Sequence, residues 1–236
     1  MGMTHSHETG HQMGLRHDGT NSSTYYGGHN NWGPIMGGPF GSDDVQWSRG
    51  EYSGANQTQN DLNIIKGKLG TVPDDVGNSN SQAKEISSSG GNEIGLIQPQ
   101  GLGRDIDGYS FKQAKSSEVT VSARPLFEGN NSSGTGANFS MRATLRNSVG
   151  SIVAQENPSN NPTSNVLNFV GELAPSTYYL TIQNKSPNTN PTTGFTEYGN
   201  GGLYQVKVSG GIIQSSEEEV CVPIQAKNGK MAFVCI

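Results

Sequence analysis

Apolar residues near the start of the chain recur with a helical spacing. In residues 57–70, Leu62, Ile65 and Leu69 are three or four positions apart, as the residues on one face of a helix are. Gly70 follows directly and is suited to end a helix. The pattern therefore predicts one helix in this segment, packed through the face that carries these three residues.

From about residue 74 to residue 212 the pattern changes to short runs in which apolar and polar residues alternate. Met141, Ala143 and Leu145 show it clearly, and alternation of this kind predicts a strand with one buried face. Several such strands, separated by loops rich in Gly, Ser and Asn, predict a β-sandwich. The expected strands are 107–113, 118–124, 139–146, 151–155, 166–173, 178–183 and 204–208.

The composition supports a turn-rich, largely β chain of extracellular type. Hydrophobic residues make up 31% and charged residues 15% of the 236 positions, and there are 33 Gly and 11 Pro. So much Gly, Asn and Ser disfavours a helical bundle, because these residues weaken helices at surface positions. A net charge of only −5 disfavours full disorder, which usually couples low hydrophobicity to high net charge.

The charge and hydropathy patterns argue against nucleic-acid binding and against a membrane-spanning segment. There are 15 basic residues against 20 acidic ones and no Lys/Arg cluster, which argues against nucleic acid. No apolar run approaches the roughly 18 residues that a membrane span requires. The first residues lack the basic and apolar regions of a signal peptide, so an export signal is expected to lie outside this chain.

The two cysteines lie near the C-terminus, on either side of a predicted hairpin. Asn228-Gly229 is a typical turn, and the three-residue loop 227–229 would place Cys221 directly opposite Cys235. Directly opposed positions of an antiparallel pair are close enough for a disulfide. The pattern predicts a Cys221–Cys235 disulfide, and the alternative is two buried free thiols.

All five histidines, at positions 5, 7, 11, 17 and 29, fall in the first 29 residues. Residues 7–18 read H-E-x-x-H-x-x-G-x-x-H-D. On a helix His7 and His11 are four residues apart, so both imidazoles lie on one face and can reach one Zn²⁺. Such segregation of histidines is what a metal site on one small segment would produce.

The remaining residues of this motif complete a catalytic type of zinc site. Glu8 lies beside the two ligands, where it can take a proton from a water that the metal activates. Gly14 is suited to end the helix in a left-handed turn, after which the chain brings back His17 as third ligand. Three protein ligands leave the fourth position open. A bare H-E-x-x-H also occurs by chance on ordinary helices. The extension to Gly14 and His17 makes an accidental match of the whole motif much rarer.

With Asp18 after the third histidine, the motif resembles the reprolysin/adamalysin-like group of the metzincin zinc endopeptidases. Members of the family place a Met in a tight turn beneath the zinc. Met36, in the sequence W-G-P-I-M-G-G, lies 19 residues after His17 with Gly and Pro around it, as a turn requires. The alternative is that Met36 is an ordinary core residue. His5 and His29 match no ligand position of the family and are expected at the surface or behind the ligands.

The resemblance implies a zinc metalloendopeptidase that acts on a protein or peptide substrate. His7, His11 and His17 would bind Zn²⁺, and Glu8 would be the general base that later passes its proton to the leaving amine. Zinc would polarise the attacking water and the scissile carbonyl. The apolar pocket for the substrate side chain would lie near Met36, Phe40 and Trp47.

Family members also carry a long N-terminal subdomain before the zinc helix, whereas only six residues precede His7 here. The chain is therefore expected to be truncated at its N-terminus, either as the C-terminal fragment of a longer protease or as a degenerate relative of the family. Two other functions compete with proteolysis. One is a non-catalytic extracellular binding or adhesion module with a residual zinc site, and the other is a protein that binds zinc without cutting.

The second half resembles the pre-peptidase C-terminal sandwich modules of secreted bacterial-type peptidases. The resemblance rests on segments 74–79, 105–111 and 173–180. It implies an extracellular location and an extracellular polymer as a further partner. Hard oxygen ligands for Ca²⁺ could come from Asp74, Asp75, Asp105 and Asp107. Paired acids in loops are also common as solvated turn residues.

Together these expectations give an α+β metzincin remnant followed by an all-β sandwich. Residues 1–72 would hold the zinc helix, the Met-turn and a C-terminal helix that packs beneath it. Residues 73–213 would form the sandwich and residues 214–236 the terminal hairpin.

Overall fold

The computed structural model describes residues 2–86, 90–126, 139–158 and 167–210, together with the backbone of 221–225 and 231–235. Two α-helices occur in these ranges, α1 (Gly2–Met13) and α2 (Asp61–Leu69), with short 3₁₀ turns at Asn80–Gln82 and Gln100–Leu102. The strands are β1 (Trp32–Pro34), β2 (Asp44–Gln46), β3 (Lys84–Glu85), β4 (Gly91–Ile97), β5 (Ile106–Gln113), β6 (Ser117–Pro125), β7 (Met141–Asn147), β8 (Ile152–Glu156), β9 (Leu167–Leu173), β10 (Ser176–Asn184), β11 (Gly202–Ser209), β12 (Cys221–Gln225) and β13 (Met231–Cys235).

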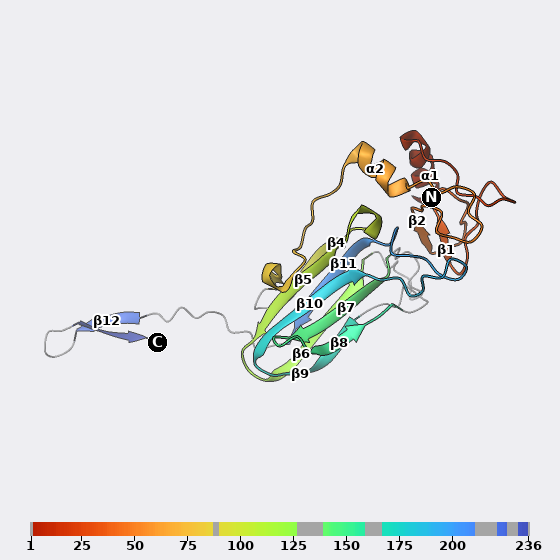
Figure 1. Ribbon diagram of the computed structural model, residues 1–236. Helices are drawn as coiled ribbons and strands as arrows, with labels where there is room; N and C mark the ends of the chain where they lie inside the picture. Colours follow the sequence, from red (N-terminus) through yellow and green to blue (C-terminus); the bar gives the residue numbers. More distant parts are fainter. Residues whose placement is uncertain are drawn as a thin grey trace.

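Strands β3 to β11 form a two-layered sandwich, which confirms the predicted β-sandwich (Figure 1). One sheet has the order β3-β5-β10-β7-β8 and the other β4-β11-β6-β9. All neighbours are antiparallel except β3 and β5. Apolar side chains from the facing sides fill the space between the sheets, among them Tyr109, Phe111, Leu145, Leu180 and Val206. Their alternation with exposed residues is the pattern seen in the sequence.

Each of the seven expected strands is present, with bounds shifted by a few residues. The sequence pattern missed β4, which contains Gly91 and Gly95 and therefore reads as a loop. A Cβ at Gly95 would lie 2.2 Å from the Tyr204 hydroxyl, so this strand needs glycine to pass the tyrosine of its neighbour β11.

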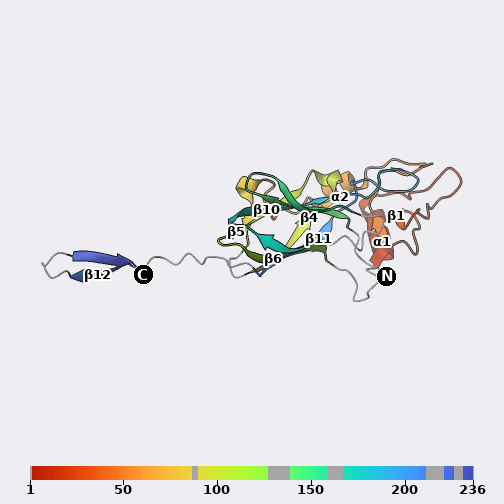
Figure 2. The same cartoon turned by 90° about the horizontal axis from the view of Figure 1, so that it is seen from below.

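Residues 2–58 and α2 lie together at one end of the sandwich and are called the N-terminal unit below (Figure 2). Its small core consists of Leu15, Ile35 and Met36, with Ile64 and Ile65 of α2 packed against them. Helix α2 therefore does pack beneath the segment around Met36, as expected.

The buried face of α2 differs from the prediction at one position. Leu62 is buried, but Leu69 is 73% exposed, so the expectation that Leu69 packs inward is wrong. Leu69 is the last residue of the helix, and the core is reached by Ile64 and Ile65 from the turn before it.

A loop of the sandwich, between β10 and β11, packs against the N-terminal unit. Phe195 stacks on Trp32 with ring centroids 6.4 Å apart. The Tyr198 hydroxyl donates to Asn60 Oδ1 at 2.8 Å and accepts from the Leu62 amide at 2.9 Å. Residues more than 130 positions apart thus hold the N-terminus of α2, and the two halves share an interface.

Strands β12 and β13 pair with each other as an antiparallel hairpin in which Cys221 is opposite Cys235. The predicted turn at Asn228-Gly229 lies outside the described residues. The disulfide itself stays a prediction, because only the backbone of these strands is described. In the described ranges, no helix has the length and apolar character needed to cross a membrane.

Candidate metal centre

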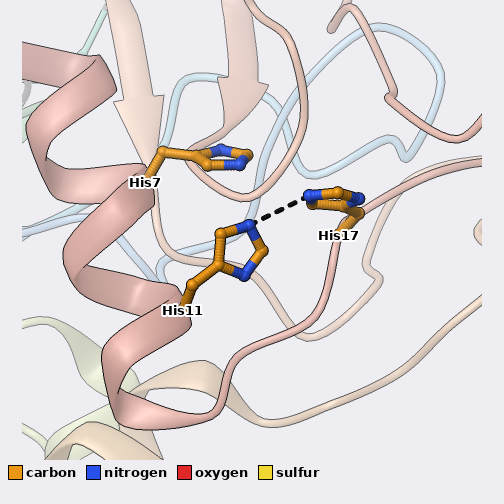
Figure 3. A group of neighbouring side chains, drawn as sticks. All are labelled: His7, His11 and His17. Atoms are coloured by element: carbon orange, nitrogen blue, oxygen red, sulfur yellow. Dashed lines mark hydrogen bonds between the residues drawn. The ribbon is translucent and has the colours of Figure 1, made fainter.

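Helix α1 presents His7 and His11 one turn apart, on the side that faces the loop after the helix (Figure 3). His7 Nδ1 lies 2.7 Å from the Ile35 carbonyl oxygen, and His11 Nδ1 lies 2.9 Å from the Leu15 carbonyl oxygen. A carbonyl oxygen can only accept, so each Nδ1 carries the proton and each Nε2 keeps its lone pair. Metal-binding histidines are commonly oriented by backbone carbonyls in this way.

The chain reverses after α1 because Gly14 adopts a left-handed conformation, with φ +95°. The Leu15 amide then bonds to the Gly10 carbonyl at 3.0 Å and closes the helix end. His17 returns on the loop, and its Nε2 lies 2.9 Å from His11 Nε2. One ring nitrogen of each of His7, His11 and His17 lies within 4.8 Å of the others, and the rings converge in Figure 3.

This donor set fits Zn²⁺. Zn–N bonds of about 2.0–2.1 Å place two nitrogens of a tetrahedral site about 3.3 Å apart. The observed His11–His17 separation of 2.9 Å is therefore within a few tenths of an ångström of that geometry. Burial, followed by the neighbouring His11 and His7, lowers the pKa of His17. The neutral imidazole, which is the form that binds metal, is thereby favoured.

Met36 lies in a tight turn behind the histidines. The Gly37 amide bonds to the Pro34 carbonyl at 2.9 Å, which closes a four-residue turn around Ile35 and Met36. The Met36 side chain is fully buried, and its carbonyl accepts the Asp18 amide at 2.8 Å. Met36 thus contacts both the helix and the return loop that carry the three histidines.

Asp18, the residue after the third histidine, points into the interior. It is fully buried, and its Oδ1 accepts from Gln57 Nε2 at 2.9 Å. Burial raises the pKa of Asp18 to about 7. The side chain therefore ties the return loop to the segment before α2.

A pocket of about 350 Å³ adjoins the histidine cluster at His7. His7 and Glu8 line it at the helix, and Phe40 lines it on the opposite segment. Of the three residues predicted around the substrate pocket, only Phe40 lies there. Met36 is fully buried and Trp47 packs against the same core cluster, and neither lines the pocket.

Tyr25 is a residue of this site that the sequence did not single out. Its ring centroid lies 4.3 Å from that of His17, and it also lines the pocket. It is 47% exposed. No spacing rule marks it, because its position depends on the irregular loop between His17 and Met36.

The two histidines outside the ligand set lie away from this pocket. His5 is exposed on α1. His29 is held between Tyr26, whose hydroxyl is 2.7 Å from Nδ1, and the Gly194 carbonyl, 2.7 Å from Nε2. His29 therefore connects the N-terminal unit to the sandwich.

A second cluster of candidate ligands lies at one end of the sandwich. Carboxylate oxygens of Asp74, Asp75 and Asp107 lie within 4.8 Å of one another. Asp107 is fully buried, its Oδ2 accepts from the Tyr204 hydroxyl, and its Oδ1 has no partner in the described structure. Burial raises the pKa of Asp107 to about 8.

The structure does not bring the fourth predicted calcium ligand into this group. Asp105 is buried, and its Oδ2 accepts the Gln98 amide at 2.7 Å instead. Asp105 is nevertheless near enough to contribute to the raised pKa of Asp107, after burial. The donor set that remains has three carboxylates and one buried, unpartnered oxygen, which fits a hard cation such as Ca²⁺.

Comparison with known proteins gives distant structural likenesses only. No protein-family model matches the chain, and no curated protein matches it significantly. A pre-peptidase C-terminal domain of collagenase from Bacillus anthracis is similar at 15% identity and a TM-score of 0.37, over 59% of this chain and 99% of that one. A periplasmic inhibitor of g-type lysozyme, PliG, from Aeromonas hydrophila is similar at 10% identity and a TM-score of 0.33, over 54% and 96%.

A third solved structure is the carbohydrate-binding module CBM35 of Abf62 from Cellvibrio japonicus, at 11% identity and a TM-score of 0.30, over 61% of this chain and 85% of that one. At these values the likenesses transfer no residue roles to this chain.

Proposed function

We propose that the N-terminal unit is a zinc-dependent endopeptidase centre that acts on protein or peptide substrates outside the cell. The observation that carries the proposal is the convergence of three imidazole nitrogens within 4.8 Å beside a pocket that Glu8 also lines. Three protein ligands leave one coordination position open, which is typical of catalytic zinc sites.

Four residues have proposed roles in hydrolysis, three as metal ligands and one as general base. His7, His11 and His17 would hold the ion, which when bound would supply Lewis-acid polarisation of water and carbonyl oxygen. Glu8 is exposed at the pocket, free of the coordination sphere, and accepts the proton of the attacking water. Glu8 then delivers that proton to the leaving amine.

Phe40 gives the pocket an apolar wall for a substrate side chain. It is 81% exposed in the absence of substrate, and large apolar side chains left in the open beside a cavity often contact a ligand. Gly37 and Gly38 lie beside it and leave room for an extended peptide backbone.

The test is the hydrolysis of a quenched fluorescent peptide library by the zinc-loaded chain, with and without chelator. Glu8→Gln keeps the ligands and should reduce turnover by about 10²–10⁴-fold with zinc content unchanged. Glu51→Gln, an acidic residue of the same unit in an ion pair with Arg49, is the matched control and should keep full turnover. Turnover that survives chelation, or equal turnover in Glu8→Gln, contradicts the proposal.

The second candidate is a non-catalytic extracellular binding module that keeps a zinc site. The specific observation in its favour is the buried, unpartnered Asp107 oxygen at the acidic cluster of the sandwich, which supports a structural Ca²⁺ site. We propose that this ion fixes the loops at one end of the sandwich and that the sandwich binds an extracellular polymer.

Calorimetry with Ca²⁺ tests the sandwich site, with Asp107→Asn as variant and the exposed Glu172→Gln as matched control. Loss of Ca²⁺ binding in Asp107→Asn alone supports the site. Cosedimentation with insoluble collagen and cellulose tests polymer binding. Zinc bound in equimolar amount without any proteolysis would favour this second candidate over the first.

A further inference from the structure

A second pocket, of about 320 Å³, lies where the N-terminal unit meets the sandwich. Asn30 and Asp44 line it from the N-terminal unit, and Asn188, Thr193 and Phe195 line it from the loop between β10 and β11. Its volume falls in the range of small-molecule sites. Neither the zinc ligands nor the acidic cluster of the sandwich contributes to it.

The pocket contains a buried carboxylate without a counter-charge. Asp44 is only 2% exposed, and its Oδ1 has no hydrogen-bond partner in the described structure. The described residues that line the pocket include no Lys, Arg or His. A buried, unpaired carboxylate is costly for a protein to maintain, so a cationic partner would stabilise it strongly.

The amide side chains of the pocket are tied to its wall by hydrogen bonds. Asn30 Nδ2 donates to the Thr193 carbonyl at 3.1 Å, and Asn188 Nδ2 donates to Thr193 Oγ1 at 2.9 Å. The oxygen of the Asn30 amide receives no donor from the described residues. Asn188 Oδ1 accepts the Asn190 amide at 2.9 Å. The acceptors left to a ligand are therefore the Asp44 carboxylate and the Asn30 amide oxygen, which suit a ligand with N–H donors.

The backbone of this wall is held in an uncommon conformation. Asn30 and Asn31 have φ +40° and +69°, and they are the non-glycine residues with positive φ among those described. The Asn31 side chain fixes Asp43 by two bonds, of 2.7 and 3.1 Å, and so secures the strand that carries Asp44. Both lie in the two-residue turn that joins His29 to Trp32, where positive φ is required at each central position and Asn is well suited to adopt it.

We propose that this pocket binds a primary ammonium or guanidinium group carried on a short apolar stem, as in the side chain of Lys or Arg. The cation pairs with Asp44, a further N–H group bonds to the Asn30 amide oxygen, and the stem lies along Phe195 and Pro187. The ligand thereby bridges the two halves of the chain. Burial, and then Asp43, raises the pKa of Asp44 to about 7.

The experiment is a titration of the full chain with n-butylammonium and n-butylguanidinium at neutral pH, with 1-pentanol as the neutral ligand of similar size. Trp fluorescence is a suitable readout, because Trp32 pairs with Asp44 across β1 and β2 and stacks on Phe195. We expect saturable binding of both cations and none of pentanol. Both cations should also raise the midpoint of thermal unfolding.

Asp44→Asn preserves the shape of the side chain and should weaken binding at least about tenfold. Asp61→Asn removes another fully buried carboxylate, outside the pocket, and should bind as the unchanged chain does. If Asp44→Asn fails to fold, Asn30→Gly is the variant to use instead. Gly tolerates the positive φ at this position, and the loss of one acceptor should weaken binding. Equal binding of pentanol, undiminished binding in folded Asp44→Asn, or stoichiometric Ca²⁺ in place of the organic cations would overturn the proposal.

Discussion

The sulfur of Met36 lies against the backbone of Gly10, so close that a Cβ on this glycine would stand 2.5 Å from it. Gly10 directly precedes His11 on α1. The residue before Met36 supplies the carbonyl that orients His7, and the Met36 carbonyl holds the amide of Asp18 beside His17. One turn therefore orients His7 and contacts the residues adjacent to His11 and His17.

Gly10→Ala should disturb this contact and weaken zinc binding. The added methyl group would also meet Leu15 and Trp47 at 3.3 Å, in a cluster where Met36 has no free space to move into. Overpacking of this kind costs about 1–3 kcal/mol. Urea unfolding and zinc affinity measure the loss. Gly67→Ala is the control, because nothing lies within 4 Å of that position in α2, and it should gain about 0.5–1 kcal/mol.

Tyr198→Phe should loosen the junction between the sandwich and α2. The change leaves the buried Leu62 amide without its acceptor and removes the donor to Asn60 Oδ1. An unsatisfied buried donor costs about 1–3 kcal/mol, which urea unfolding detects. Tyr25→Phe removes a half-exposed hydroxyl and should change stability by less than about 0.5 kcal/mol. Equal effects of the two variants would contradict the role of Tyr198.

The stability of the metal-free chain should fall as the pH rises. Burial raises the pKa of Asp107 from 3.8 to about 8, so the folded state keeps a proton that the unfolded state has released between these values. The contribution is fully present below pH about 4 and is lost as the pH approaches about 8. Asp107→Asn should flatten this part of the profile of unfolding temperature against pH. Millimolar Ca²⁺ should restore stability at pH 8 and have little effect at pH 4, because it binds the ionised carboxylates.

Phe40→Ala should reduce turnover of substrates with a large apolar side chain more than that of substrates with a small one. The loss of one apolar wall is worth about 1–3 kcal/mol, or roughly 10–200-fold in kcat/KM. Phe40 is 81% exposed, so folding should be unaffected. Val149→Ala, at an equally exposed position of the sandwich, controls for nonspecific effects. An equal loss of kcat/KM for every substrate would argue against contact between Phe40 and the substrate side chain.

The parts of this structure that local spacing determines could be predicted from the sequence. His7 and His11 share a helix face because they are four residues apart, and Gly14 ends that helix because it can adopt positive φ. The alternating strands of the sandwich followed from the same kind of argument, since each buries one face. The opposition of Cys221 and Cys235 followed from turn length.

The parts of the structure that depend on contacts between distant residues could not be predicted from the sequence. Gly95 makes β4 look like a loop, and only the position of Tyr204 on β11 explains it. Tyr25 reaches His17 through an irregular loop, and Leu69 stays exposed because the core lies one turn earlier in α2. The loop that carries Phe195 and Tyr198 meets residues more than 130 positions away, so no local pattern reveals it.

The most direct test of the central claim is the zinc content of the full chain after equilibrium dialysis, compared with that of His11→Gln. We expect one tightly bound Zn²⁺ per chain, lost in His11→Gln and retained in Gln12→Ala, a change at the adjacent exposed helix position. The removal of one of three ligands leaves too few donors for a stable site. Absence of zinc from the unchanged chain, or undiminished zinc in folded His11→Gln, would contradict the assignment of the three histidines as a metal centre.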